Sequence, residues 1–138
     1  MTDASAALIE HIPLFAGLDG RELREVAGSL RERVFPAGSP IFEEGSSGIG
    51  FFVIASGTAA VSVAGQDVRT LGPGDHFGEV ALIADTPRTA TITAESDLVC
   101  YGMTVWDFRA VVESNATIAW KLLQSLARAL RDAEQRGQ

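Results

Sequence analysis

The sequence contains a single cysteine, Cys100, so the chain cannot form an internal disulfide. Cys100 lies in an alternating apolar run, which predicts a small buried residue in a reducing compartment, and we expect a cytoplasmic protein. The N-terminus has no basic cluster ahead of an apolar block, so neither a secretory nor a transit signal is predicted. The longest apolar run, residues 51–65, is interrupted by serine, threonine and glycine, which argues against a membrane-spanning helix.

Positive charge is also scarce. The chain has 18 acidic and 11 basic residues and a formal net charge of −7, which predicts a surface that repels DNA, RNA and anionic membranes. Between Val34 and Phe108 the only basic side chains are Arg69 and Arg88. Arginines this isolated in acidic surroundings require a specific explanation.

The N-terminal part of the chain has the residue pattern of two helices. Residues 5–11 predict a short helix that ends before Pro13. Asp19 with Glu22 three residues later predicts a capping box at the start of a second helix. Its buried stripe is predicted to consist of Leu23, Val26, Ala27 and Leu30.

Helical spacing returns after Thr104, which is a candidate cap for a helix over 105–114. Asn115 is a second candidate cap, and residues 118–133 contain no glycine or proline, which predicts a long amphipathic helix. We expect Lys121 to face away from its apolar stripe and residues 132–138 to be frayed. The predicted stripe consists of Leu122, Leu126, Ala129, Leu130 and Ala133.

Residues 34–103 have a different pattern. Short runs rich in valine, isoleucine, phenylalanine and threonine alternate with the turn clusters PAGSP, EGSSGIG, AGQD and LGPGD. This pattern predicts a mainly β fold, a small antiparallel barrel or jelly roll, with flanking helices. The strand pattern is interrupted once, by FGEVALIADTPRTAT at residues 77–91.

The interruption has the residue types of an anion site. Gly78 allows close approach of a ligand, and residues 79–83 favour a helical turn whose free N–H groups attract anions. Arg88 follows the proline that stops this turn, and Thr89 adds a hydroxyl. The helix end, the guanidinium and the hydroxyl can converge on one phosphate.

Glu79 in the same segment would repel a lone phosphate. A carboxylate can instead accept hydrogen bonds from a ribose hydroxyl, as acidic residues do in dinucleotide-binding folds. Phosphate and ribose together indicate a nucleotide. A single arginine without a GxxxxGK[ST] motif favours a ligand with one negative charge over a triphosphate.

These residues resemble the cyclic-nucleotide-binding domains of the catabolite activator protein, protein kinase regulatory subunits and nucleotide-gated channels. The resemblance covers residues 12–130, and its most specific part is the phosphate-binding cassette, here FGEVALIADTPRTAT at 77–91. Supporting matches are PLFAGLDGREL, FPAGSPIFEEG, VIASG and LGPGDHFGE. The resemblance implies a β-roll of eight strands flanked by helices. We therefore expect one domain over 1–138, with N-terminal helices in 1–33, the β-roll in 34–103 and C-terminal helices in 104–138.

The resemblance also implies roles for particular residues. Gly78 and Glu79 would contact the ribose and Arg88 the cyclic phosphate, and Thr89 would complete the cradle with backbone amides. The implied ligand-binding residues are Gly78, Glu79, Val80, Ala81, Arg88, Thr89 and Ala90. By rough alignment, Ala133 and Glu134 occupy the positions from which the long helix contacts the base. The sequence departs from the family pattern at Ile49, where an acid is common, and at Ala116, where a proline is common after Asn115.

We therefore expect a sensor that binds a cyclic mononucleotide, with cAMP favoured over cGMP, and signals through its C-terminal helix. No cofactor, metal or catalysis is predicted, because His76 and His11 are the only histidines and no nucleophile with a base is evident. The alternative is a degenerate roll that binds no nucleotide and serves dimerisation or docking. The apolar stripe of the long helix can form the seam of a homodimer or cover the roll, and the homodimer is favoured. The chain ends at Gln138 without an effector domain, which predicts a separate or missing output partner and no nucleic-acid binding by this chain alone.

Overall fold

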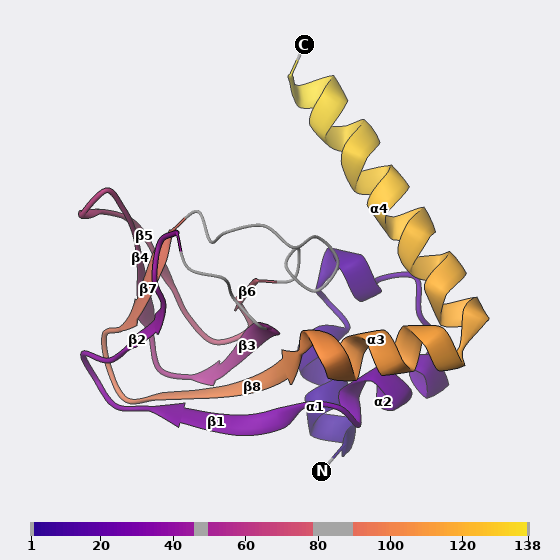
Figure 1. The fold of residues 1–138 in the computed structure, drawn as a ribbon, viewed down its shortest axis with the longest axis horizontal. Helices are drawn as coiled ribbons and strands as arrows, with labels where there is room; N and C mark the ends of the chain where they lie inside the picture. Colours follow the sequence, from indigo (N-terminus) through magenta and orange to yellow (C-terminus); the bar gives the residue numbers. More distant parts are fainter. Residues whose placement is uncertain (1, 46–49, 79–89, 138) are drawn as a thin grey trace. The chain divides into compact units, whose positions relative to one another are not determined.

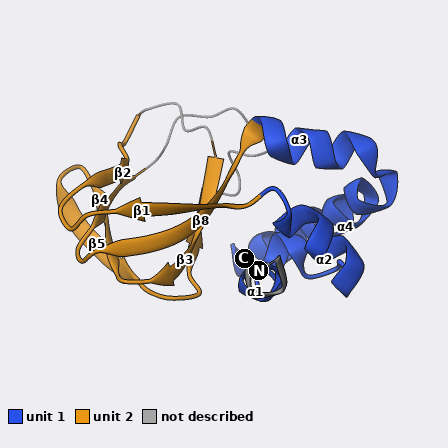
Figure 2. Cartoon of the chain, turned by 90° about the horizontal axis from the view of Figure 1, so that it is seen from below, with its two compact units in different colours: residues 1–29, 106–138 blue, residues 30–105 orange. Residues whose placement is uncertain are grey.

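The structure, a computed structural model, describes residues 2–45, 50–78 and 90–137. The chain divides into two compact units (Figure 2). The helical unit combines residues 1–29 with 106–138, and the roll unit consists of residues 30–105. No helix in the described part of the chain has the length and apolar character needed to cross a bilayer.

The roll unit contains the strands of the fold (Figure 1). The strands form two four-stranded sheets, with orders β1-β8-β3-β6 and β2-β7-β4-β5, and the paired strands are antiparallel. This architecture, together with the flanking helices, confirms the predicted mainly β fold. β1 begins at Arg31, ahead of the expected Val34, because it pairs with β8 from Arg31 onward. The strands are β1 (Arg31–Phe35), β2 (Pro40–Phe42), β3 (Gly50–Ser56), β4 (Ala59–Val63), β5 (Gln66–Leu71), β6 (His76–Phe77), β7 (Thr91–Ala94) and β8 (Leu98–Thr104).

The core of the roll lies between the two sheets. It is built from alternate residues of the strands, as β7 shows with its buried Ile92 and Ala94. Cys100 on β8 is fully buried, as the sequence predicted, and desolvation raises its thiol pKa to about 11. The buried members of this core are Phe42, Ile54, Ala59, Val61, Leu71, Phe77, Ile92, Ala94, Leu98 and Cys100.

The helical unit is formed by both ends of the chain. α1 ends at Ile9, before the end at residue 11 that the sequence predicts. The reason is that Pro13 holds Ile12 in an extended conformation and a 3-10 turn follows. The predicted capping box of α2 is confirmed, since Asp19 Oδ1 accepts from the Glu22 N–H and Glu22 Oε1 from the Asp19 N–H, each at 2.9 Å. The predicted stripe of α2 is buried. The elements are α1 (Thr2–Ile9), η1 (Pro13–Phe15), α2 (Gly20–Ala27), α3 (Val105–Ser114) and α4 (Ala116–Arg136).

α4 differs from the expected helix in two respects. Its buried face consists of Ile118, Leu122 and Ser125, whereas most of the predicted stripe is exposed. The helix also continues through Arg136, so the expectation of a frayed tail from residue 132 was wrong. The predicted cap is confirmed, because Asn115 Oδ1 accepts a hydrogen bond from the Ile118 N–H at 3.1 Å. The exposed members of the predicted stripe are Leu126, Ala129, Leu130 and Ala133.

Candidate functional site

The two described ends of segment 77–91 lie in different sheets. On the N-terminal side, Phe77 belongs to β6, which pairs with β3. On the C-terminal side, β7 begins at Thr91 and pairs with β2 and β4. Gly78 has φ +91°, a conformation that favours glycine, so the chain turns sharply as it leaves β6.

Two of the predicted ligand-binding residues are described. Gly78 occupies the turn after β6, and Ala90 is partly buried and packs against the core of the roll. The other predicted residues of the segment, Glu79, Val80, Ala81, Arg88 and Thr89, lie outside the described residues. The predicted base contacts, Ala133 and Glu134, lie near the end of α4 in the helical unit, where both are exposed.

The LGPGD turn anchors the N-terminal side of the segment. Asp75 Oδ2 accepts a hydrogen bond from the Gly72 N–H at 2.8 Å, and the Asp75 N–H donates to the Gly72 carbonyl at 3.0 Å. The turn is also tied to β3, because Ile54 donates to the Asp75 carbonyl at 2.9 Å and accepts from Gly74 at 2.8 Å. These contacts fix the direction in which the chain enters β6.

An aromatic cluster lies directly before Gly78. Phe52 and Phe77 are paired across β3 and β6, with ring centroids 5.7 Å apart. Phe42 from the other sheet meets Phe77 edge to face at 5.3 Å and Phe52 at 5.6 Å, and Phe35 meets Phe52 at 5.7 Å. Such pairs are worth about 0.5–1.5 kcal/mol each beyond their buried area. The cluster therefore joins the two sheets at the entrance to the segment.

Gly102 provides the space that Phe52 occupies. The two residues face each other in the register of β3 and β8, and a Cβ added at Gly102 would overlap the Phe52 ring. Phe52 can lie over the β8 backbone only because residue 102 has no side chain. A glycine in this strand thus positions the aromatic cluster.

The C-terminal side of the segment is anchored through Thr91. Its hydroxyl accepts a hydrogen bond from the Glu44 N–H at 2.9 Å. The Glu44 carboxylate in turn accepts from the Ala64 N–H, also at 2.9 Å, in the turn between β4 and β5. Both ends of the segment are therefore held by hydrogen bonds, on the N-terminal side to β3 and on the C-terminal side to neighbouring loops of the roll.

The described contacts anchor both ends of segment 77–91. Arg69 is exposed on β5, where it pairs with Val61 in the register, so its place is on the outer edge of a sheet. Within the described ranges there is no group of three or more residues that could hold a metal ion.

Reasoning from the sequence did not identify the anchoring residues. Asp75 was part of a recognised turn cluster, and the spacing of Gly72 and Asp75 is the signal that could have revealed its carboxylate contact. Glu44 and Thr91 are 47 positions apart, so no local pattern indicates their hydrogen bond. The same holds for the four phenylalanines, which come from four strands.

Comparison with known proteins gives consistent matches. The profile of the cyclic nucleotide-binding domain family matches residues 32–115. A cyclic AMP receptor protein of Thermus thermophilus is 32% identical over 127 residues, which cover 88% of this chain and 59% of the relative. A cyclic nucleotide-gated potassium channel of Rhizobium etli is 36% identical over 112 residues, which cover 81% of this chain and 31% of the channel. The chain thus spans less than two thirds of either relative.

A solved structure matches over nearly its full length. It is the N-terminal domain of a transcriptional regulator from Streptomyces coelicolor A3(2), with a TM-score of 0.86 and 27% sequence identity. The match covers 93% of this chain and 95% of that domain. The fold similarity therefore includes both the roll and the flanking helices.

Proposed function

The chain belongs to the cyclic nucleotide-binding domain family, and we propose that it is a sensor for a cyclic mononucleotide, with cAMP favoured over cGMP. The observation that carries this proposal is the intact cassette FGEVALIADTPRTAT, within the matched range 32–115. The proposed role is regulatory and not enzymatic. We place the protein in the cytoplasm, which suits its buried free cysteine.

The proposed site uses the residues of the cassette. Gly78 and Glu79 hold the ribose, Arg88 holds the cyclic phosphate, and Thr89 acts with the backbone amides of the segment, which includes Val80, Ala81 and Ala90. Two described features support this assignment. Gly78 has the φ of +91° that lets the backbone turn toward a ligand, and Ala90 is packed on the core, which gives the segment a fixed end. Ala133 and Glu134 are proposed to contact the base.

Arg88→Ala tests the proposed phosphate contact. Because a hydrogen bond to a charged group is worth about 1.5–3 kcal/mol, we expect the affinity for cAMP to fall by about ten- to a hundred-fold. Isothermal titration calorimetry with cAMP and with cGMP measures the change. Arg69→Ala is the matched control, because Arg69 is the other arginine between Val34 and Phe108 and lies exposed on β5. Equal affinities of the two variants would overturn the assignment of Arg88.

We propose that the signal passes through α4, which also serves as the seam of a homodimer. One row of apolar residues on α4 recurs with spacings of four, three, four and three, the spacing of a helix–helix seam. Leu123 and Leu130 on this seam are 57% and 63% exposed in the single chain. Leu123 thus replaces Leu122 of the stripe predicted from the sequence. The seam consists of the partly buried Ala119 and the exposed Leu123, Leu126, Leu130 and Ala133.

Leu130→Glu tests the proposed seam. A charge in the seam should shift the chain toward monomer, because a desolvated and unpaired carboxylate is costly. Gln124→Glu is the control, since it adds the same charge to an exposed position on another face of α4. Sedimentation equilibrium compares the two variants with the wild-type chain. Identical association of Leu130→Glu and Gln124→Glu would exclude this face as the dimer contact.

The exposed seam also favours a second candidate function. In this alternative the roll binds no nucleotide, and the chain acts as a dimerisation or docking module through α4. A thermal-shift screen against cAMP, cGMP, cyclic dinucleotides, AMP and ATP separates the two functions. A ligand present at a hundred times its dissociation constant stabilises the folded state by about 2.7 kcal/mol. A shift with one cyclic mononucleotide supports the sensor, and no shift across the panel supports the alternative.

We also propose that the two compact units work as one domain over residues 1–138, with its output in a separate partner or in a further part of a longer protein. The relatives differ in this respect, since one is a potassium channel and another a receptor protein. Both are longer than the matched region. The response that ligand binding triggers is therefore proposed to depend on the partner, or on the longer protein that contains this chain, and not on the roll itself.

A further inference from the structure

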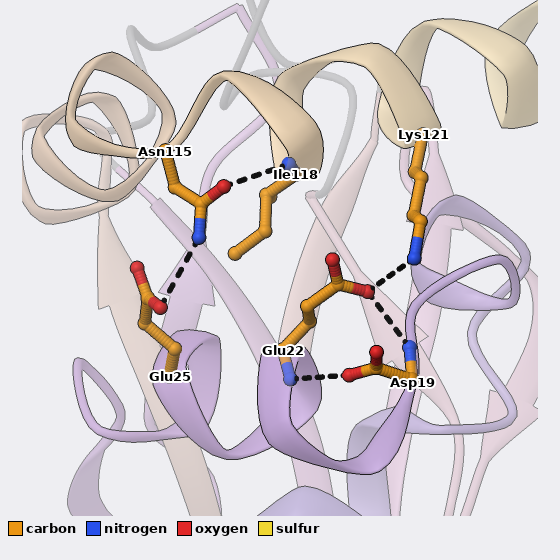
Figure 3. Close-up of polar contacts among 6 residues, drawn as sticks. All are labelled: Asp19, Glu22, Glu25, Asn115, Ile118 and Lys121. Atoms are coloured by element: carbon orange, nitrogen blue, oxygen red, sulfur yellow. Dashed lines mark hydrogen bonds and ion pairs between the residues drawn. The ribbon is translucent and has the colours of Figure 1, made fainter.

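Two polar contacts join α2 to the first turns of α4 (Figure 3). In the first, Lys121 Nζ donates to Glu22 Oε1 at 2.7 Å. In the second, Asn115 Nδ2 donates to Glu25 Oε1 at 3.3 Å. Glu22 and Glu25 are three residues apart on α2, so their side chains leave the same face of that helix.

The contact between Glu22 and Lys121 is largely removed from water. The side chain of Glu22 is 11% exposed and that of Lys121 is 28% exposed. The hydrogen bond from Lys121 to Glu22 raises the pKa of the lysine above its ordinary value of 10.5, so the ammonium stays charged at neutral pH. A carboxylate this deeply buried is costly to leave without its partner.

The same carboxylate oxygen also belongs to the capping box of α2. Glu22 Oε1 accepts from the Asp19 N–H at 2.9 Å and from Lys121 Nζ. If Lys121 leaves, Glu22 must turn toward water to be solvated, and the Asp19 N–H then loses its acceptor. The position of α4 and the first turn of α2 are thus coupled through one atom.

In the second contact, Asn115 likewise both bridges the two helices and caps one of them. Asn115 donates to Glu25 and, through Oδ1, caps α4 by accepting from the Ile118 N–H at 3.1 Å. Asn115 and Lys121 stand on either side of Ile118, which is fully buried. Beyond Ser125, the described residues of α4 are all exposed. The helix is therefore held at its beginning and projects without such contacts at its end.

We propose that Glu22, Glu25, Asn115 and Lys121 form a clasp that opens as a unit and so controls the release of the first turns of α4 from α2. The closed clasp holds the beginning of α4 and completes two helix caps. The open clasp frees α4 and loosens the start of α2. Because its stronger contact is an ion pair that is largely removed from water, raised ionic strength shifts the clasp toward the open form only weakly. The clasp is a feature of the ligand-free chain and does not depend on nucleotide binding.

Amide hydrogen exchange of the full chain without nucleotide tests the clasp. The reporters are the backbone amides of residues 118–122 in α4 and 19–22 in α2, with the amides of β8 as an internal reference. E22Q removes the charge but keeps an oxygen that can cap α2, and K121M removes the charge but keeps the apolar stem. Each variant is expected to speed exchange in α4 by about ten-fold or more, since the lost contact is a hydrogen bond between charged groups.

The double variant E22Q/K121M separates a coupled clasp from two independent side chains. If the clasp opens as a unit, exchange in the double variant matches that of the faster single variant. In K121M, exchange at 19–22 is also expected to rise. Wild-type exchange in α4 should increase only slightly with sodium chloride concentration, and the double variant should not show this increase.

R109M is the matched control. Arg109 pairs with Glu113 at 2.8 Å in the same unit, but the two side chains are 74% and 63% exposed. We expect R109M to leave exchange in α4 unchanged. Multiplied single effects in the double variant, unchanged exchange in E22Q, or an equal response to R109M would each overturn the clasp. If K121M also speeds exchange in β8, the chain has unfolded globally, and E22Q then decides. Faster exchange in α4 of E22Q than of R109M supports the clasp, and exchange equal to that of the wild-type chain overturns it.

Discussion

The roll and the helical unit keep their shapes by different means. Among the described residues, every backbone conformation with positive φ occurs in the roll. These residues are Gly38, Gly45, Gly57, Gly65, Gly74, Gly78 and Ala64. Glycine adopts a positive φ at little cost, whereas most other residues avoid it. The positions of these residues in the sequence therefore determine where the turns of the roll form.

The helical unit relies instead on contacts between side chains that are far apart in the sequence. Glu22 and Lys121 are separated by 99 positions, and Asn115 and Glu25 by 90. A contact between side chains can break and form again without changing the backbone of either helix. The roll therefore gives the cassette a fixed frame, whereas the helical unit contains the parts that can change position.

Leu122→Ala and Leu123→Ala give the largest contrast within the helical unit. Leu122 is 4% exposed and Leu123 is 57% exposed, although they are neighbours on α4. Leu122→Ala should lower the free energy of unfolding by about 2–5 kcal/mol, because it leaves a cavity. Leu123→Ala should change it by less than about 0.5 kcal/mol at concentrations where the chain is monomeric. Urea denaturation followed by circular dichroism measures both.

The concentration dependence of the Leu123 variant sharpens this contrast. If Leu123 lies in a dimer seam, its substitution destabilises the protein only at concentrations where the wild-type chain associates. Leu122→Ala should cost the same at every concentration. Equal losses for the two variants in the monomer would contradict the observed orientation of α4.

Gly102→Ala tests whether the roll depends on its glycines as argued. The added Cβ would overlap the Phe52 ring and disturb the aromatic cluster before Gly78, with an expected loss of about 1–3 kcal/mol of unfolding free energy. Gly72→Ala is the control, because nothing lies within 4 Å of its added Cβ and its φ is not positive. Thermal denaturation compares the two. The double variant Gly102→Ala with Phe52→Leu should recover part of the loss, and no recovery would point to a cause other than the ring.

The parts of the fold that follow from local signals could be predicted from the sequence. The capping box of Asp19 and Glu22 and the cap at Asn115 depend on residues three positions apart, and both are present. The alternating strands and turn clusters likewise predicted a mainly β roll. In the cassette, the residue types indicated a nucleotide and the resemblance to the family supplied individual roles, which stay predictions.

The orientation of α4 could not be predicted in this way. Leu122 and Leu123 are both apolar, so periodicity alone allows either to face inward, and the buried face includes the polar Ser125. Lys121 was expected to face solvent because it is charged. It instead pairs with the buried Glu22, a contact that only the folded helical unit brings together. Contacts within the folded helical unit, and not the local spacing of apolar residues, therefore determine which face of α4 is buried.

Ala64→Asn is expected to stabilise the roll by a small amount. Ala64 has φ +53° and Gly65 has φ +81°, and they connect the paired residues Val63 and Gln66 in a two-residue hairpin turn. Such turns favour Asn-Gly, because asparagine adopts the left-handed conformation at lower cost than alanine. The hydrogen bond from the backbone of residue 64 to Glu44 is kept. We expect a gain of about 0.5–1 kcal/mol in chemical denaturation.

Gly65→Ala in the same turn should have the opposite sign. Nothing lies within 4 Å of the added Cβ, so any loss reflects backbone strain alone. That strain should cost about 1 kcal/mol, because alanine is unfavourable at positive φ. Stabilisation by the first variant with destabilisation by the second would show that backbone conformation, and not side-chain contact, sets this corner of the roll. A loss for Ala64→Asn with no change for Gly65→Ala would contradict that view, because neither result is compatible with a left-handed turn.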